Sequence, residues 1–315
     1  MWETIIQITP HAVAFTIPLL VVSLGGLYSE RSGVVNIGLE GFMIVGMFAG
    51  ALTVATLAPS MQGAAVWLGL LMAVLVGAVF ALLHAFACVT LNANQVISGT
   101  AINMVAGALT TYLARNITGS GNIVIPIALP RQNLAYLADI PIIGEMFFRR
   151  AYATTLLVLV ILAVSTVLLY RTRFGLRLRA CGENPHAADA AGINIYRMRY
   201  IAVAISGALA SLGGAIFLVT IAGEYSGSAG GLGFLALAAL IFGQWKPLGL
   251  LGATFFFGLA STVANVSRIL PYLAHIPDIV LQTFPYVVTL LALVAFSRSS
   301  QAPKALGEPY DKGRR

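Results

Sequence analysis

Charged residues are scarce in this chain, and their scarcity excludes an ordinary soluble domain. Asp, Glu, Lys and Arg make up 9% of its 315 residues, whereas a soluble domain carries about 25%. Hydrophobic residues make up 59%, the mean hydropathy is +0.90, and several apolar runs reach the roughly 20 residues that cross a bilayer. Since no water satisfies the backbone inside a bilayer, these runs should be helices. We expect one all-α, polytopic membrane domain over residues 1–300 and a cytoplasmic tail over residues 301–315.

Catalytic and metal-binding motifs are also lacking. There is no GxxxxGK[ST] phosphate loop, no HExxH and no GxSxG. The two cysteines, Cys88 in an apolar run and Cys181 in a polar loop, should lie at different depths, which argues against a disulfide. The net charge of +7 comes from Arg clusters in a few loops, as expected beside an anionic inner leaflet. We therefore expect no enzyme, no cofactor, no metal site and no nucleic-acid binding.

The apolar runs predict about nine membrane spans, within a range of eight to ten. They lie at about 11–28, 34–57, 66–91, 96–114, 152–170, 199–221, 228–243, 248–266 and 278–297. The seventh opens on a glycine-rich stretch and ends at a turn-like QWKPLG, so a broken or re-entrant helix near 228–249 competes with an ordinary helix and a tight loop. Trp245, in that turn, is expected to anchor at the membrane interface.

Basic residues predict the orientation of the chain. Arginines fill the loop at 171–199, and basic residues also follow position 297, which places both regions in the cytoplasm and the N-terminus outside. The loop at 115–151 argues the other way, because it carries four arginines on the outer side. Long loops follow the rule less strictly, so we keep a multi-pass protein of the cell membrane with its C-terminus inside.

Three polar residues within the spans are candidates for the lining of a substrate path. Glu40 lies early in the second span, where an ionised side chain should face the bundle interior, either lining a path or anchoring helices. Asn36 is four residues earlier and is expected on the same helix face. Asn103, inside the fourth span, suits a neutral polar ligand or a helix–helix hydrogen bond.

The sequence of the Arg-rich loop predicts a short helix. Asn184 is a suitable N-cap, Pro185 suits the first helical position, and Gly192 stands where a left-handed C-cap would end the helix. Glu183, His186 and Asp189 offer polar contacts around a slim, alanine-rich body. A loop that only sets topology needs no such helix, so we interpret it as a docking site for a soluble partner.

Four segments carry a resemblance to a known family. They are ERSGVVNIGLEGFM near the N-terminus, NQVISGTAINM at 94–104, GENPHAADAAGIN with its flanking RTRFGLRLRA and SGALASLGGAIF, and FLALAALIFGQWKPLG at 234–249. Together they resemble permease subunits of bacterial ABC importers for branched-chain amino acids, ribose-type sugars and nucleosides. The nucleoside-type, or simple-sugar-like, branch is the most similar.

The resemblance implies an import channel without its own motor. It implies three partners: an ATP-binding subunit, a second and non-identical permease, and an extracytoplasmic substrate-binding protein. The short helix would sit in a groove of the ATP-binding subunit, with contacts from Glu183, Asn184, Pro185, His186, Asp189 and Gly192. The alternatives are the same machine for a pentose, another simple sugar or a branched-chain amino acid, and an ion-gradient-driven secondary transporter.

Overall fold

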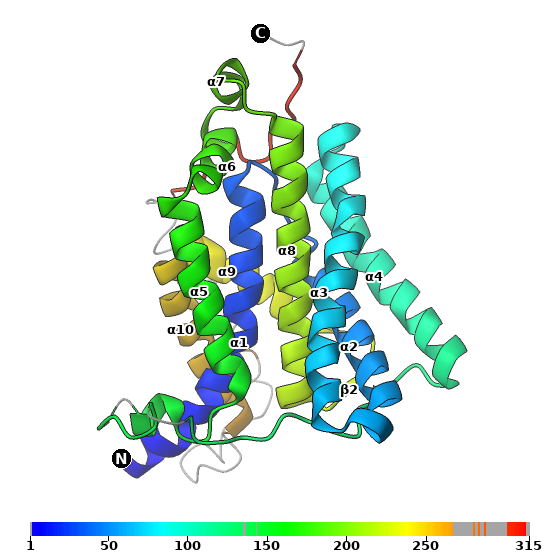
Figure 1. Ribbon diagram of the computed structural model, residues 1–315, viewed down its shortest axis with the longest axis vertical. Coiled ribbons are helices and arrows are strands. Elements are labelled where there is room, and N and C mark those ends of the chain that lie inside the picture. Colours follow the sequence, from blue (N-terminus) through cyan, green and yellow to red (C-terminus); the bar gives the residue numbers. More distant parts are fainter. Residues whose placement is uncertain are drawn as a thin grey trace.

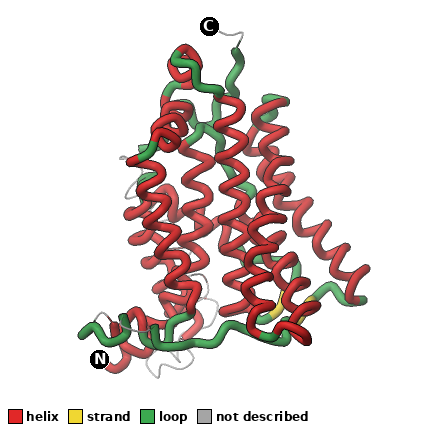
Figure 2. Tube along the Cα trace, in the orientation of Figure 1, coloured by secondary structure: helices red, strands yellow, loops and turns green. Residues whose placement is uncertain are grey.

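The computed structural model describes residues 2–134, 137–142, 144–266, 280, 283, 287 and 301–312. This part of the chain is almost entirely helical (Figures 1 and 2), with two strands of two residues each. Six helices are long and apolar enough to cross a membrane, which confirms the all-α polytopic membrane fold. The expected ninth span at 278–297 falls mostly on residues outside the described part.

The long helices match the expected spans to within a few residues at most boundaries. They are α1 (Trp2–Arg31), α2 (Leu39–Met61), α3 (Gly63–Ala85), α4 (Gln95–Thr118), α5 (Ala153–Arg171) and α8 (Ile195–Phe217). Two of them continue as π-helical turns, α3 into η1 (Phe86–Thr90) and α8 into η3 (Leu218–Ala222). Shorter elements are α6 (Arg173–Glu183), α7 (Pro185–Ala190), α9 (Leu232–Phe242), α10 (Pro247–Val266) and η2 (Gly144–Phe148). The strands β1 (Ile123–Val124) and β2 (Glu224–Tyr225) pair antiparallel.

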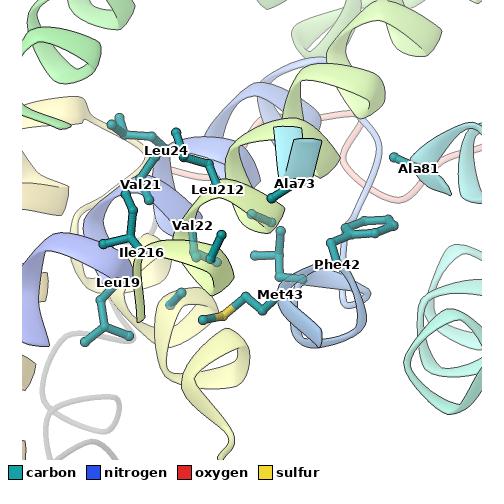
Figure 3. Close-up of a cluster of buried hydrophobic side chains, with 14 of the residues drawn as sticks. Leu19, Val21, Val22, Leu24, Phe42, Met43, Ala73, Ala81, Leu212 and Ile216 are labelled. Carbon is teal, nitrogen blue, oxygen red and sulfur yellow. The ribbon is translucent and has the colours of Figure 1, made fainter. Parts of the chain in front are cut away.

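The core lies where α1, α2, α3 and α8 pack together (Figure 3), with apolar side chains from all four helices in one cluster. Helix α1 is buried on nearly all sides because it is apolar all round. Small residues allow close approach: a side chain at Gly46 of α2 would overlap the carbonyl of Ser211 in α8. Helix α4, by contrast, stands at the edge of the bundle (Figure 1).

Helix α9 is too short to cross a membrane by itself. Its 11 residues span about 17 Å, against the roughly 30 Å of a hydrocarbon core. It ends in a tight turn in which Gln244 and Trp245 have φ values of +53° and +51°, and α10 begins directly afterwards at Pro247. The glycine-rich stretch before α9 and the turn after it therefore delimit a short, inserted helix.

The two ends of the bundle carry different elements. Helices α6 and α7 and the C-terminal segment lie at the upper end in Figure 1, whereas the N-terminus and the small sheet lie at the lower end. The loop between α1 and α2 descends from that upper end into the bundle (Figure 1).

Candidate functional site

Residues 34–38 form a non-helical segment between α1 and α2. Side chains of neighbouring helices satisfy its backbone: Val35 N–H donates to Gln95 Oε1 (2.7 Å), and Asn103 Nδ2 donates to Ile37 O (3.0 Å). His84 Nε2 lies 3.1 Å from Val35 O. Irregular backbone between membrane helices is tolerated only where protein buries it or where it lines a water-filled path.

The expectation that Asn36 and Glu40 share a helix face is therefore wrong. Gly33 has a φ of +93° and breaks the chain direction after α1, and α2 begins only at Leu39. The apolar run through 34–38 does not form a helix because α3 and α4 supply its hydrogen-bond partners instead.

Asn36 lies fully buried in this segment. Its Nδ2 donates to Ser206 Oγ of α8 (2.8 Å), while its Oδ1 is enclosed and has no hydrogen-bond partner among the described residues. The same holds for Nε2 of the nearby Gln95. Enclosed polar groups without partners are rare in native proteins, so these two atoms call for an explanation.

Glu40 links α2 to the start of α9. Its Oε1 accepts from Gly231 N–H (2.9 Å) and its Oε2 from Gly233 N–H (2.7 Å). These are N–H groups at a helix N-terminus, where a carboxylate is favoured by both the free donors and the helix dipole. A side chain at Gly233 would overlap the backbone of Glu40, so glycine is required for this approach.

Asn103 of α4 completes the arrangement. Its Oδ1 accepts from Gly41 N–H (2.7 Å), in addition to the bond from Nδ2 to Ile37 O. The three candidate residues thus meet on one stretch of chain, residues 36–41, and tie it to α8, α9 and α4. Sequence reasoning missed Gln95, at the start of an apolar run, and His84, within another, as partners of this stretch.

The expected short helix in the Arg-rich loop is confirmed as α7. Asn184 Oδ1 accepts from Ala187 N–H (3.0 Å), Pro185 occupies the first turn, and Gly192 has a φ of +81°. Glu183, Asn184 and His186 are exposed, whereas Pro185 is buried against the bundle. The preceding Arg-rich run was not expected to be helical, but it forms α6, with Thr172 as its N-cap and Leu178 and Cys181 on the buried face.

The C-terminal segment packs against this helix pair. Ala305 N–H donates to Gly182 O (2.9 Å) and Gly307 N–H to Gly33 O (3.1 Å). The Tyr310 ring lies between His186 of α7 and Tyr196 of α8, with centroid separations of 5.3 and 5.8 Å. Residues 301–312 therefore hold α7 against the bundle, a role that their polar composition did not indicate.

Arg199 was counted as a loop residue that sets topology, but it is only 1% exposed. Its Nε donates to Ser32 O (3.2 Å) and its Nη1 to Glu308 O (3.1 Å). It thereby joins α8 to the α1–α2 loop and to the C-terminal segment.

A second group of contacts connects the end of α1 to the turn between α9 and α10. Arg31 Nη2 donates to Trp245 O (2.8 Å), and the same guanidinium lies 3.7 Å from the carboxylate of Glu183. Trp245 Nε1 donates to Glu30 Oε2 (2.6 Å). Trp245 is 4% exposed, so the expectation that it anchors at the membrane interface is wrong. Its indole is buried because Glu30 supplies its hydrogen-bond partner inside the protein.

Comparison with known proteins identifies the family. Residues 10–295 match the family described as branched-chain amino acid transport system / permease component. The chain belongs to this permease family. That membership confirms the resemblance drawn from the four sequence segments, and it makes the chain a multi-pass membrane component of a transport system and not an enzyme.

Individual relatives span nearly the whole chain. The chain is 44% identical to the guanosine ABC transporter permease protein NupQ of Bacillus subtilis, over 98% of this chain and 97% of NupQ. It is 40% identical to the nucleoside ABC transporter permease protein NupC of Lactococcus lactis subsp. cremoris, over 99% of each chain. A second Bacillus subtilis protein, the guanosine ABC transporter permease protein NupP, is 26% identical over 99% of this chain and 84% of NupP.

Proposed function

We propose that this chain is one of two non-identical permeases of an ATP-driven importer of nucleosides. Two nearly full-length relatives at 44% and 40% identity carry guanosine or nucleoside in their names. NupQ and NupP of one bacterium both resemble this chain, at clearly different identities, which supports a pair of distinct permeases. The other partners would be an ATP-binding subunit and an extracytoplasmic substrate-binding protein, in the cell membrane.

We assign the substrate path to the surroundings of the non-helical segment because two buried amide atoms there have no hydrogen-bond partner among the described residues. Nucleosides are uncharged and offer both donors and acceptors, which suits Asn36 Oδ1 and Gln95 Nε2 once the transport cycle moves the surrounding helices and exposes these enclosed atoms. Glu40 and Asn103, whose polar atoms are engaged within the protein, would frame the path by fixing α9 and α4 to residues 36–41.

Helix α7 would dock into the ATP-binding subunit. It is rigidly capped, exposed on its outer face and braced from behind by Tyr310. The contact residues proposed are Glu183, Asn184, Pro185, His186, Asp189 and Gly192.

Movement of α7 would reach the substrate path through the contacts at Arg31. Glu183, the last residue of α6, pairs with Arg31, and Arg31 donates to the carbonyl of Trp245 in the turn after α9. The other end of α9 is held by Glu40, beside the proposed path. A displacement of α7 would therefore bias the position of α9, which is a short element able to occupy two states.

For the membrane topology, we propose nine crossings, one of which is made by the non-helical stretch at 223–231 together with α9. The N-terminus would lie outside, and α7 and the C-terminus would lie in the cytoplasm. Labelling of single introduced cysteines in intact cells tests this: A187C on α7 should react only after permeabilisation, and N122C at the opposite end should react before it. The reverse pattern would overturn the orientation.

The test of function is reconstitution of both permeases with the ATP-binding subunit and the substrate-binding protein in vesicles. Labelled guanosine or another nucleoside should accumulate only with ATP, and an excess of pentose or branched-chain amino acid should not compete. Accumulation driven by an ion gradient without ATP would refute the proposal. ATP-dependent uptake of a pentose alone would support the ATP-driven importer but overturn the nucleoside as its substrate.

A further inference from the structure

Four arginines cluster where α5 ends and α6 begins. Arg171, Arg173 and Arg177 are exposed, and Arg179 rests on the ring of Tyr170 with its Cζ 4.9 Å from the ring centroid. No acidic residue occurs in the sequence between Glu145 and Glu183. Within the described part of the chain, none of the four forms an ion pair, and the enclosed Nε of Arg179 has no hydrogen-bond partner. The cluster is thus an unneutralised cationic surface.

The same surface carries an apolar side chain that faces outward. Leu176 is 62% exposed and stands between Arg173 and Arg177 on the outer side of α6. The opposite side of α6 packs on the bundle through Leu178 and Cys181. A soluble surface gains nothing from an exposed leucine among arginines, but a helix that lies in a membrane interface does.

The preceding helix, α5, carries a stripe that has the properties of a lipid-facing surface. Exposed apolar side chains recur along α5 at helical spacing, and they are Leu156, Val160, Val164, Val167 and Tyr170. The stripe ends at Tyr170, the residue type that favours the headgroup level. The arginines begin at the next residue. This order predicts that their guanidinium groups lie near the level of the lipid headgroups.

We propose that α6 is an interfacial helix that binds anionic phospholipid headgroups through Arg171, Arg173, Arg177 and Arg179, with Leu176 inserted among the acyl chains. Guanidinium groups suit phosphates because they present planar, paired donors. Helix α6 leads directly into α7, so bound lipid would give the coupling helix a fixed base. That consequence rests on the proposed function, whereas lipid binding itself does not.

An acidic surface of the ATP-binding subunit is the alternative binding partner for these arginines. It would not account for the exposed Leu176 or for the apolar stripe on α5 that ends directly before the arginines. Two basic residues beside α7, Arg197 and Lys312, are also exposed and are nearer to the proposed motor contact. Replacing these two residues removes the same charge as replacing Arg173 and Arg177, so the pair serves as the control in the experiment below.

The first experiment measures the depth of Leu176. L176C carries a nitroxide label in the assembled transporter, in nanodiscs that contain phosphatidylglycerol; the native Cys88 and Cys181 are 1% and 0% exposed and should not react. Burial also raises the pKa of the Cys181 thiol to about 11, which further suppresses its reaction. The label at 176 should collide mainly with oxygen, and a label on N122C, in an exposed loop at the opposite end of the bundle, mainly with a water-soluble nickel complex. Equal exposure of both labels to nickel would overturn the proposal.

The second experiment measures the preference for anionic lipid. Binding of short-chain phosphatidylglycerol to the detergent-solubilised transporter should weaken about 25-fold in R173Q/R177Q, since each basic residue near an anionic surface contributes about fivefold. R173K/R177K should retain most binding, and R197Q/K312Q should bind as the parent does. Equal loss of lipid binding in R173Q/R177Q and in R197Q/K312Q would show that binding is not specific to the surface of α6. Unchanged lipid binding in R173Q/R177Q with loss of the ATP-binding subunit would assign the arginines to that subunit instead.

Discussion

Replacing Glu40 tests whether one carboxylate holds the start of α9. In the structure both oxygens accept backbone N–H bonds, at 2.9 and 2.7 Å, in a buried position. Glu40→Ala leaves two buried N–H groups without acceptors, and each costs about 1–3 kcal/mol, so the local destabilisation should be about 2–6 kcal/mol. Glu40→Gln keeps one carbonyl oxygen but turns an amide NH₂ toward the second N–H group. It should cost about 1–3 kcal/mol.

Hydrogen exchange of the peptide that includes Gly231 and Gly233 measures this directly. A loss of 1–3 kcal/mol should accelerate exchange of these amides about 5- to 150-fold in Glu40→Gln, with a larger effect in Glu40→Ala. Glu224→Gln, an exposed carboxylate on β2, is the matched control and should leave the exchange unchanged. Uptake should fall in the same order as the protection. Normal protection of Gly231 and Gly233 in Glu40→Ala would show that Glu40 does not hold the start of α9, whatever happens to uptake.

Three further changes probe the path, the coupling helix and its support. Asn36→Ala removes an unused buried acceptor and should weaken substrate affinity in ATP-driven uptake about 5- to 150-fold, whereas Asn122→Ala in an exposed loop should not; equal affinities would remove Asn36 from the path. Gly192→Val strains a residue with a φ of +81° by about 1–2 kcal/mol and should lower the substrate imported per ATP hydrolysed; an unchanged ratio would argue against docking at α7. Tyr310→Ala removes two ring contacts worth about 0.5–1.5 kcal/mol each and should loosen binding of the ATP-binding subunit, whereas Tyr310→Phe should retain it; equal binding by both variants would argue against the brace.

The sequence predicted best those features that depend on local rules. Membrane helices follow from uninterrupted apolar runs, and α7 follows from Asn184, Pro185 and Gly192, whose cap and turn preferences act within a few residues. The break at residues 34–38 escaped prediction because its cause lies elsewhere in the chain. The segment is mostly apolar, and after the break at Gly33 it stays non-helical because Gln95, His84 and Asn103 satisfy its backbone from other helices.

The buried polar contacts at the upper end of the bundle escaped prediction for a related reason. Arg199 and Trp245 are residue types that commonly mark loops and interfaces, and single-sequence reasoning assigns them that role by default. In the structure each is buried because a partner more than 100 residues away accepts its hydrogen bond, Glu308 for Arg199 and Glu30 for Trp245. Long-range pairing of this kind leaves no periodic signal in the sequence.

Glu40 and Glu30 fix the two ends of α9 by hydrogen bonds, a constraint that the length of the helix alone does not reveal. The helix is held at its N-terminus by Glu40 and, through Trp245, at its other end by Glu30 and Arg31. Directional hydrogen bonds at both ends change only when they exchange partners. Arg31 offers such an exchange, because its guanidinium lies close to both the Trp245 carbonyl and Glu183, the last residue of α6. If α7 docks as proposed, we expect the transport cycle to shift the hydrogen bonds of Arg31 from the α9–α10 turn toward Glu183 and α7.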